Sequence, residues 1–128
     1  MTRKRIVIVN DDSLLSKTMH MSLSERGHDV RAFRSGLEAV KYLSEDKPDS
    51  IVLDIRLPDC DGWFVAKLLE RFEWSGNVPI IVTSVLEPDR RAIAEVKPYA
   101  YIQKPFDMGQ LVEAVERSLG GGESLAGV

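Results

Sequence analysis

One run of β-branched residues constrains the fold more than any other feature of this chain. Residues 6–9 read Ile-Val-Ile-Val without a polar interruption, and the run ends abruptly in Asn10, Asp11 and Asp12. Such a run is typical of a central strand in a parallel sheet, because that strand is covered on both faces. We therefore expect a parallel sheet with acidic residues at the carboxyl end of one inner strand.

Four further short runs predict strands. They lie at residues 29–33, 50–54, 79–83 and 100–103. The run at 29–33 alternates apolar and polar residues, which is typical of an edge strand with one face exposed to solvent. The run at 50–54 is continuous and ends in Asp54.

The segments between the strands show helical spacing and recognisable caps. We expect one helix capped by Ser13 and stopped by Gly27, one capped by Ser35 and one over residues 63–74. A fourth should follow Pro88, which suits a first helical turn, and end before Pro98, and a fifth should cover residues 108–119.

Alternating strands and helices indicate an α/β fold, a doubly wound parallel sheet with helices on both faces. We predict five strands and five helices with the flavodoxin-like strand order 2-1-3-4-5, because the first strand is the most hydrophobic and the second the least. Residues 1–119 would form one domain. Residues 120–128, which begin Gly-Gly-Gly, would be a flexible tail or the start of a linker.

Composition excludes several classes of function. The net charge of −3 gives no basic surface for nucleic acid. No stretch approaches the roughly 18 apolar residues that cross a membrane, and no signal peptide is present, so we expect a cytoplasmic protein. The single cysteine, Cys60, cannot form an internal disulfide and has no CxxC partner that would indicate a metal site.

Polar residues follow several of the predicted strands. The sets are Asn10-Asp11-Asp12 after the first strand, Asp54 at the end of the third, Thr83 and Ser84 at the fourth, and Lys104-Pro105 after the fifth. In an open α/β sheet these carboxyl ends form one edge and hold the ligand site. Each residue could also have a purely structural role. Asp11 or Asp12 could cap a helix, Thr83 could be a strand residue without a function, and Lys104 could be a charged surface residue.

Taken together, these polar residues have the chemistry of a metal-assisted phosphoryl-transfer site. Clustered carboxylates repel one another unless a cation lies between them. Oxygen ligands without His or Cys favour a hard ion, Mg²⁺ above all. A carboxylate such as Asp54 could then attack phosphorus, while the ammonium of Lys104 stabilises the charge of the transferred group and Thr83 donates to it.

Over residues 4–119 the chain resembles the receiver domain of bacterial two-component response regulators. The matching motifs are Asn10-Asp11-Asp12, Ile51-Val52-Leu53-Asp54 followed by Leu57-Pro58 and Asp61-Gly62, Val82-Thr83-Ser84, and Tyr101 with Lys104-Pro105-Phe106. The resemblance implies that Asp54 accepts a phosphoryl group from a histidine kinase or phosphotransfer protein. It also implies that the domain signals to an output domain or target protein and does not turn over an external substrate.

The resemblance assigns roles to the other site residues. Mg²⁺ would be held by Asp11, Asp54 and the backbone carbonyl of Arg56, with Asn10 orienting a metal-bound water. Lys104 would pair with the phosphoryl group, and the peptide bond before Pro105 would be cis. Thr83 would move to meet the phosphoryl group and Tyr101 would swing inward, so that the fourth helix, fifth strand and fifth helix change together.

The chain departs from the family pattern in ways that keep alternatives open. Asn10 stands where the family usually has an acidic residue, and the acidic pair could instead be Asp11-Asp12. Residues 97–99, Lys-Pro-Tyr, replace a usual Gly-Ala-acidic turn. One alternative is a pseudo-receiver that is not phosphorylated, favoured by Asn10. Another is a phosphotransfer enzyme of the haloacid-dehalogenase type, although that family has its Asp-x-Asp after the first strand. A flavodoxin-type cofactor binder would need a phosphate loop there.

Overall fold

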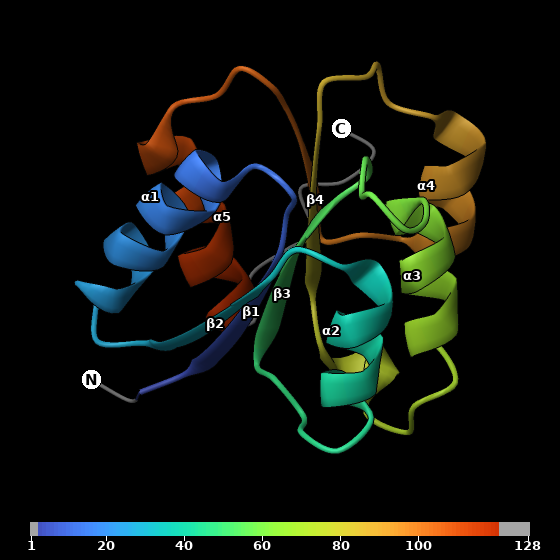
Figure 1. Ribbon diagram of the computed structural model, residues 1–128, viewed down its shortest axis with the longest axis horizontal. Helices are drawn as coiled ribbons and strands as arrows, with labels where there is room; N and C mark the ends of the chain where they lie inside the picture. Colours follow the sequence, from blue (N-terminus) through green and yellow to red (C-terminus); the bar gives the residue numbers. More distant parts are fainter. Residues whose placement is uncertain (1–2, 121–128) are drawn as a thin grey trace.

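Five parallel strands form one sheet in the predicted order, β2-β1-β3-β4-β5, in a computed structural model that describes residues 3–120 (Figure 1). The strands are β1 (Arg5–Val9), β2 (Asp29–Phe33), β3 (Ser50–Asp54), β4 (Ile80–Ser84) and β5 (Ala100–Gln103). The helices are α1 (Ser13–Ser24), α2 (Gly36–Leu43), α3 (Gly62–Leu69), α4 (Arg90–Val96) and α5 (Met108–Leu119), and a short 3₁₀ helix, η1, spans Ser75–Asn77. The predicted α/β fold is confirmed.

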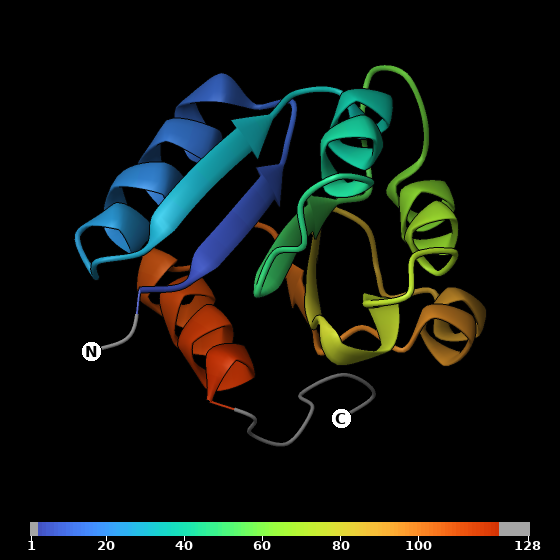
Figure 2. The same cartoon turned by 90° about the horizontal axis from the view of Figure 1, so that it is seen from below.

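Two helical layers cover the sheet. Helices α1 and α5 lie on one face, and α2, α3 and α4 lie on the other (Figures 1 and 2). Alternate residues of the inner strands enter the two cores: Ile6 and Ile8 face α1 and α5, whereas Val7 and Val9 face α2 and α3. This explains why β1 is apolar at every position from residue 6 to residue 9.

Three predicted helix boundaries were wrong. Asp12, and not Ser13, is the N-cap of α1, since its carboxylate accepts the Leu15 N–H at 3.1 Å. Pro88 lies before the N-cap of α4, which is Asp89. The third helix, predicted over residues 63–74, ends at Leu69 and continues as turns into η1.

The cause of the third error lies in two aromatic rings. Phe72 and Trp74 continue the apolar spacing of α3, but they lie in the turn that follows the helix. From there they pack against the second core, which is the core that contains Val7 and Val9, and their ring centroids are 5.4 Å apart. The fifth helix has the predicted limits, and Ser35 caps α2 as expected.

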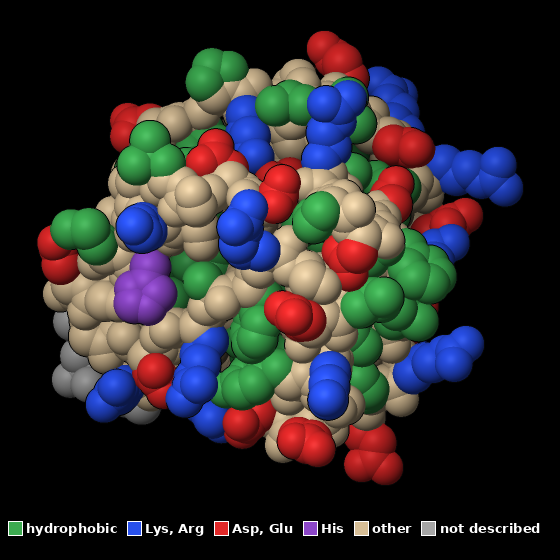
Figure 3. Space-filling model, in the orientation of Figure 1, with side chains coloured by type: hydrophobic (Ala, Val, Ile, Leu, Met, Phe, Trp, Pro, Cys, Tyr) green, Lys and Arg blue, Asp and Glu red, His purple; other side chains and the backbone are tan. Residues whose placement is uncertain are grey.

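Three predictions concern the end of the chain, membrane spans and the surface. The proposed tail, residues 120–128, lies outside the described residues except for Gly120. Within residues 3–120, no helix is both long and apolar enough to cross a membrane. On the face shown in Figure 3, basic and acidic side chains are interspersed and form no extended basic surface.

Candidate functional site

Some of the polar residues predicted from the strand ends lie side by side at one edge of the sheet. Val9 pairs with Leu53, so Asn10 and Asp54 end neighbouring strands, and Asp54 in turn pairs with Thr83. All three side chains are buried; Asn10 is 1% exposed, Asp54 5% and Thr83 0%. Polar groups so withdrawn from water require partners or a ligand.

The centre of the site is an ion pair between the third and fifth strand ends. The Lys104 Nζ lies 2.7 Å from Asp54 Oδ2, and the two side chains are 17% and 6% exposed. Lys104 is placed by its backbone N–H, which donates to the Ser84 carbonyl at 2.7 Å. The peptide bond between Lys104 and Pro105 is cis, as predicted.

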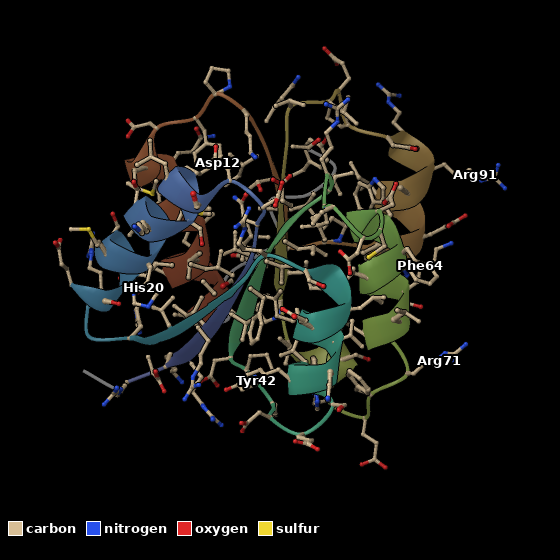
Figure 4. The ribbon with its side chains drawn as sticks, in the orientation of Figure 1. Asp12, His20, Tyr42, Phe64, Arg71 and Arg91 are labelled. Atoms are coloured by element: carbon tan, nitrogen blue, oxygen red, sulfur yellow. The ribbon has the colours of Figure 1, made fainter. Side chains whose placement is uncertain are left out.

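The acidic residues after β1 divide into two environments. The Asp12 carboxylate caps α1, whereas Asp11 is exposed and its Oδ1 lies 3.4 Å from the Arg34 guanidinium. Figure 4 shows Asp12 at the start of α1. The Asp12 carboxylate is thus engaged by the start of its helix, whereas the Asp11 carboxylate takes part only in an exposed ion pair.

Two buried polar atoms at this edge have no hydrogen-bond partner among residues 3–120. They are Asn10 Nδ2 and Thr83 Oγ1. The other amide atom of Asn10, Oδ1, accepts the Asp12 N–H at 2.8 Å. Unpaired buried groups of this kind are rare in folded proteins and mark strained or functional positions.

Tyr101 faces away from the buried site. Its hydroxyl donates to the Leu86 carbonyl at 2.8 Å, and its ring stacks on Trp63 with centroids 6.2 Å apart and planes 17° apart. The residue belongs to β5, one position from Ile102, which pairs with Thr83. The Tyr101 side chain is therefore in an outward orientation. The inward orientation expected from the resemblance would require this side chain to rotate.

The loop from β3 to α3 carries Arg56 close to Asp54. Arg56 forms an isolated antiparallel bridge with Asp61, and the Gly62 N–H donates to the Ile55 carbonyl at 2.7 Å. A Cβ on Gly62 would lie 2.7 Å from the Ile55 Cα and would also collide with the Asp54 carbonyl. Glycine at this position thus lets the start of α3 approach the backbone of the Asp54 strand end.

Sequence analysis missed Asp59, which holds the other side of this loop. Its carboxylate accepts hydrogen bonds from Gly36 N and Leu37 N, both at 2.9 Å, and from Ser35 Oγ at 2.8 Å. The backbone N–H groups of Leu37 and Gly36 lower the Asp59 pKa to about 2. The Pro58-Asp59 turn is the only local signal, and it does not identify the distant helix that Asp59 contacts.

The donor set fits a hard divalent ion. Asp11 after β1 and Asp54 at the end of β3 could supply carboxylate oxygens, and the backbone carbonyl of Arg56, two residues beyond Asp54, could complete the set. Within residues 3–120, no group of three or more His, Cys, Asp or Glu side chains gathers that could hold a metal. Two carboxylates completed by a carbonyl and waters suit Mg²⁺, which commonly retains several waters when bound by proteins.

The fold and the site together are a parallel α/β sheet with a buried carboxylate–ammonium pair at the carboxyl ends of its strands. The family model of the response regulator receiver domain matches residues 6–116, and the chain belongs to that family. The polar-differentiation response regulator DivK of Brucella ovis is 32% identical over 119 residues, which cover 91% of this chain and 97% of that protein.

Solved structures agree with this assignment. The receiver domain of a sensor histidine kinase from Pseudomonas aeruginosa, solved with a magnesium ion in its active-site cleft, is 26% identical with a TM-score of 0.82, covering 93% of this chain and 99% of that one. A CheY-like receiver from Methanospirillum hungatei shares the fold, with a TM-score of 0.85 at 22% identity, covering 94% and 96%. This family is a signalling family, so the haloacid-dehalogenase alternative is not favoured.

Proposed function

We propose that Asp54 accepts a phosphoryl group and that the remaining site residues stabilise and transmit this modification. The observation that carries the proposal is the buried pair between Asp54 and Lys104, 2.7 Å apart, beside the Thr83 hydroxyl, which has no hydrogen-bond partner among residues 3–120. A carboxylate in this setting is a nucleophile held next to a cation that can pair with phosphoryl oxygens.

The proposed transfer forms one bond and breaks one. An Asp54 carboxylate oxygen attacks phosphorus, and the bond from phosphorus to a histidine nitrogen of the donor breaks, with the electron pair leaving on the imidazole. Lys104 pairs with the phosphoryl oxygens as the charge moves. Mg²⁺ held by Asp11, Asp54 and the Arg56 carbonyl would supply further positive charge at those oxygens. Water later hydrolyses the acyl phosphate, and no external substrate is turned over.

The proposed signal passes through Thr83 and Tyr101. The Thr83 hydroxyl donates to the bound phosphoryl group, Tyr101 leaves Leu86 and Trp63 and turns inward, and the surface of α4, β5 and α5 changes. A two-state switch needs such a differential contact. The donor is a histidine kinase or phosphotransfer protein, the reader is an output domain or target protein, and residues 1–119 act as the receiver domain in the cytoplasm.

Labelling by acetyl phosphate with Mg²⁺, read by intact mass, tests the proposal. Wild type should gain one phosphoryl group and Asp54→Asn should gain none. Asp46→Asn, an exposed carboxylate paired with Arg5, is the matched control and should label like wild type. Labelling of Asp54→Asn would disprove the assignment. A wild type that takes up no phosphoryl group would instead favour the pseudo-receiver, whose distinguishing feature is Asn10.

A further inference from the structure

The amide of Asn10 has only one orientation that satisfies its neighbour. The backbone N–H of Asp12 lies 2.8 Å from the Asn10 side chain, and because an N–H can only donate, the atom that meets it is the oxygen, Oδ1. The other amide atom, Nδ2, must then point away from this turn. Asn10 is 1% exposed, and Nδ2 finds no acceptor among the described residues.

The strand register places this unpaired donor beside the phosphoryl acceptor. Asn10 follows the Val9–Leu53 pair, so it ends β1 next to Asp54 at the end of β3. Both residues continue the alternation of Ile6, Ile8 and Val52, which face α1 and α5, and so both side chains belong to the same side of the sheet. A buried donor that is unpaired in one state is suited to an acceptor that arrives in another.

We propose that Asn10 Nδ2 donates a hydrogen bond to the phosphoryl group carried by Asp54, so that Asn10 is a phosphoryl-binding residue and neither a metal ligand nor an orienter of metal-bound water. This inference rests on the proposed function of Asp54. The Oδ1 atom, which is the only atom of the amide that could face a cation, is turned toward the Asp12 N–H, and this hydrogen bond takes one of its two lone pairs. The Nδ2 atom carries hydrogens that repel a cation and attract the phosphoryl oxygens. An aspartate here would attract Mg²⁺ but repel the same oxygens.

Three variants separate a phosphoryl contact from a metal contact. Asn10→Ser removes Nδ2 but retains an oxygen that can accept the Asp12 N–H. Asn10→Asp keeps the acceptor and adds a charge. The chain has one other asparagine, Asn77, which is exposed in η1, so Asn77→Asp controls for net charge. Mg²⁺ binding is titrated first, and beryllofluoride, a mimic of the phosphoryl group, is then titrated at saturating Mg²⁺.

The inference predicts that each substitution of Asn10 affects the binding of the two ligands differently. Asn10→Ser should leave the Mg²⁺ Kd unchanged and raise the beryllofluoride Kd about tenfold, the effect of one lost hydrogen bond to a charged group. Asn10→Asp should lower the Mg²⁺ Kd, destabilise the metal-free protein in thermal melts and raise the beryllofluoride Kd. Asn77→Asp should behave as wild type. A metal contact would instead make Asn10→Ser weaken Mg²⁺ binding, and unchanged beryllofluoride binding in Asn10→Ser would overturn the inference.

A wild-type measurement does not depend on the folding of any variant. The Asn10 side-chain NH₂ resonances, assigned by ¹⁵N NMR, should shift downfield when beryllofluoride is added and move little with Mg²⁺ alone. A shift produced fully by Mg²⁺, with no further change on beryllofluoride, would overturn the inference while leaving Asp54 as the acceptor. If wild type binds no beryllofluoride at all, the proposed function itself fails, and this inference fails with it.

Discussion

Helices α4 and α5 flank the same edge strand, yet they are held to the protein in different ways. Helix α5 has 12 residues and buries Leu111, Val112, Ala114, Val115 and Ser118. Helix α4 has 7 residues and buries none of them. Its attachments are Val96, packed at the edge of the second core, and an exposed ion pair from Glu95 to Lys67 at 2.7 Å. Figure 4 shows Arg91 of α4 pointing into solvent.

The difference indicates which part of the proposed output surface can move. Segments with few buried apolar contacts open at low free energy, whereas core helices open only with the whole domain. We therefore expect α5 to act as a fixed frame and α4 to change position or order when Thr83 and Tyr101 respond to phosphorylation.

The largest expected effect comes from matched truncations in the two helices. Val115→Ala in α5 removes two methyl groups from a fully buried site and should lower the free energy of unfolding by about 2–3 kcal/mol. Val96→Ala in α4 should cost about 1 kcal/mol or less, because that side chain is only partly buried. Urea denaturation of both variants provides the comparison. Equal losses would show that α4 is anchored as firmly as α5.

Amide exchange should show the same contrast directly. With beryllofluoride and Mg²⁺, exchange rates between Thr83 and Tyr101 should change by about tenfold, equivalent to about 1.4 kcal/mol in local opening, while α5 keeps its protection. Hydrogen exchange read by mass spectrometry on proteolytic peptides has the required resolution. Changes restricted to α1 and α2 would contradict the proposed path of the signal.

A smaller effect is expected from the hydroxyl of Tyr101. Tyr101→Phe removes the hydrogen bond to the Leu86 carbonyl that is made in the outward orientation, and it should lower the free energy of unfolding by about 0.5–1 kcal/mol. The same loss should let beryllofluoride act at lower concentration, since the competing outward state is weakened. Tyr42→Phe, on α2, is the control. A higher beryllofluoride requirement would mean that the hydroxyl supports the inward state.

The smallest effect concerns the ion pair that links α4 to α3. The hydrogen bond and charge of Lys67 lower the Glu95 pKa, so the pair stabilises the folded state above the pKa of an unfolded carboxyl group. This contribution disappears as the pH falls through the folded pKa. The stability difference between wild type and Glu95→Gln should therefore be detectable near pH 7 and vanish in acid, measured by thermal melts. Glu73→Gln makes the same charge change and is the control.

Much of the fold was predictable because the strands are buried on both faces. The unbroken run at residues 6–9 and the weaker one at 29–33 identified the centre and edge of the sheet, and parallel strand ends then brought Asp54 and Lys104 together. Helix ends were less certain, since Asp12 and Ser13 are both good caps and only backbone geometry selects between them. Trp74 shows that apolar spacing can continue beyond a helix when a turn contributes to the core.

The finer features of the site depend on partners distant in the chain. Asp59 binds the start of α2, more than twenty positions earlier, and Tyr101 stacks on Trp63, 38 positions earlier. Periodicity and capping rules describe neighbours within a few residues, so they carry no information on such contacts. The orientation of the Asn10 amide likewise follows from a single backbone hydrogen bond.

The stack of Trp63 on Tyr101 also gives the protein an optical reporter. The chain has two tryptophans, and the other, Trp74, packs against Phe72 at the turn after α3. In a Trp74→Phe variant, all indole emission would come from Trp63, the ring that contacts Tyr101. Departure of Tyr101 would alter the quenching and solvent exposure of that ring, so a stopped-flow fluorimeter could follow the rate of switching without an attached dye.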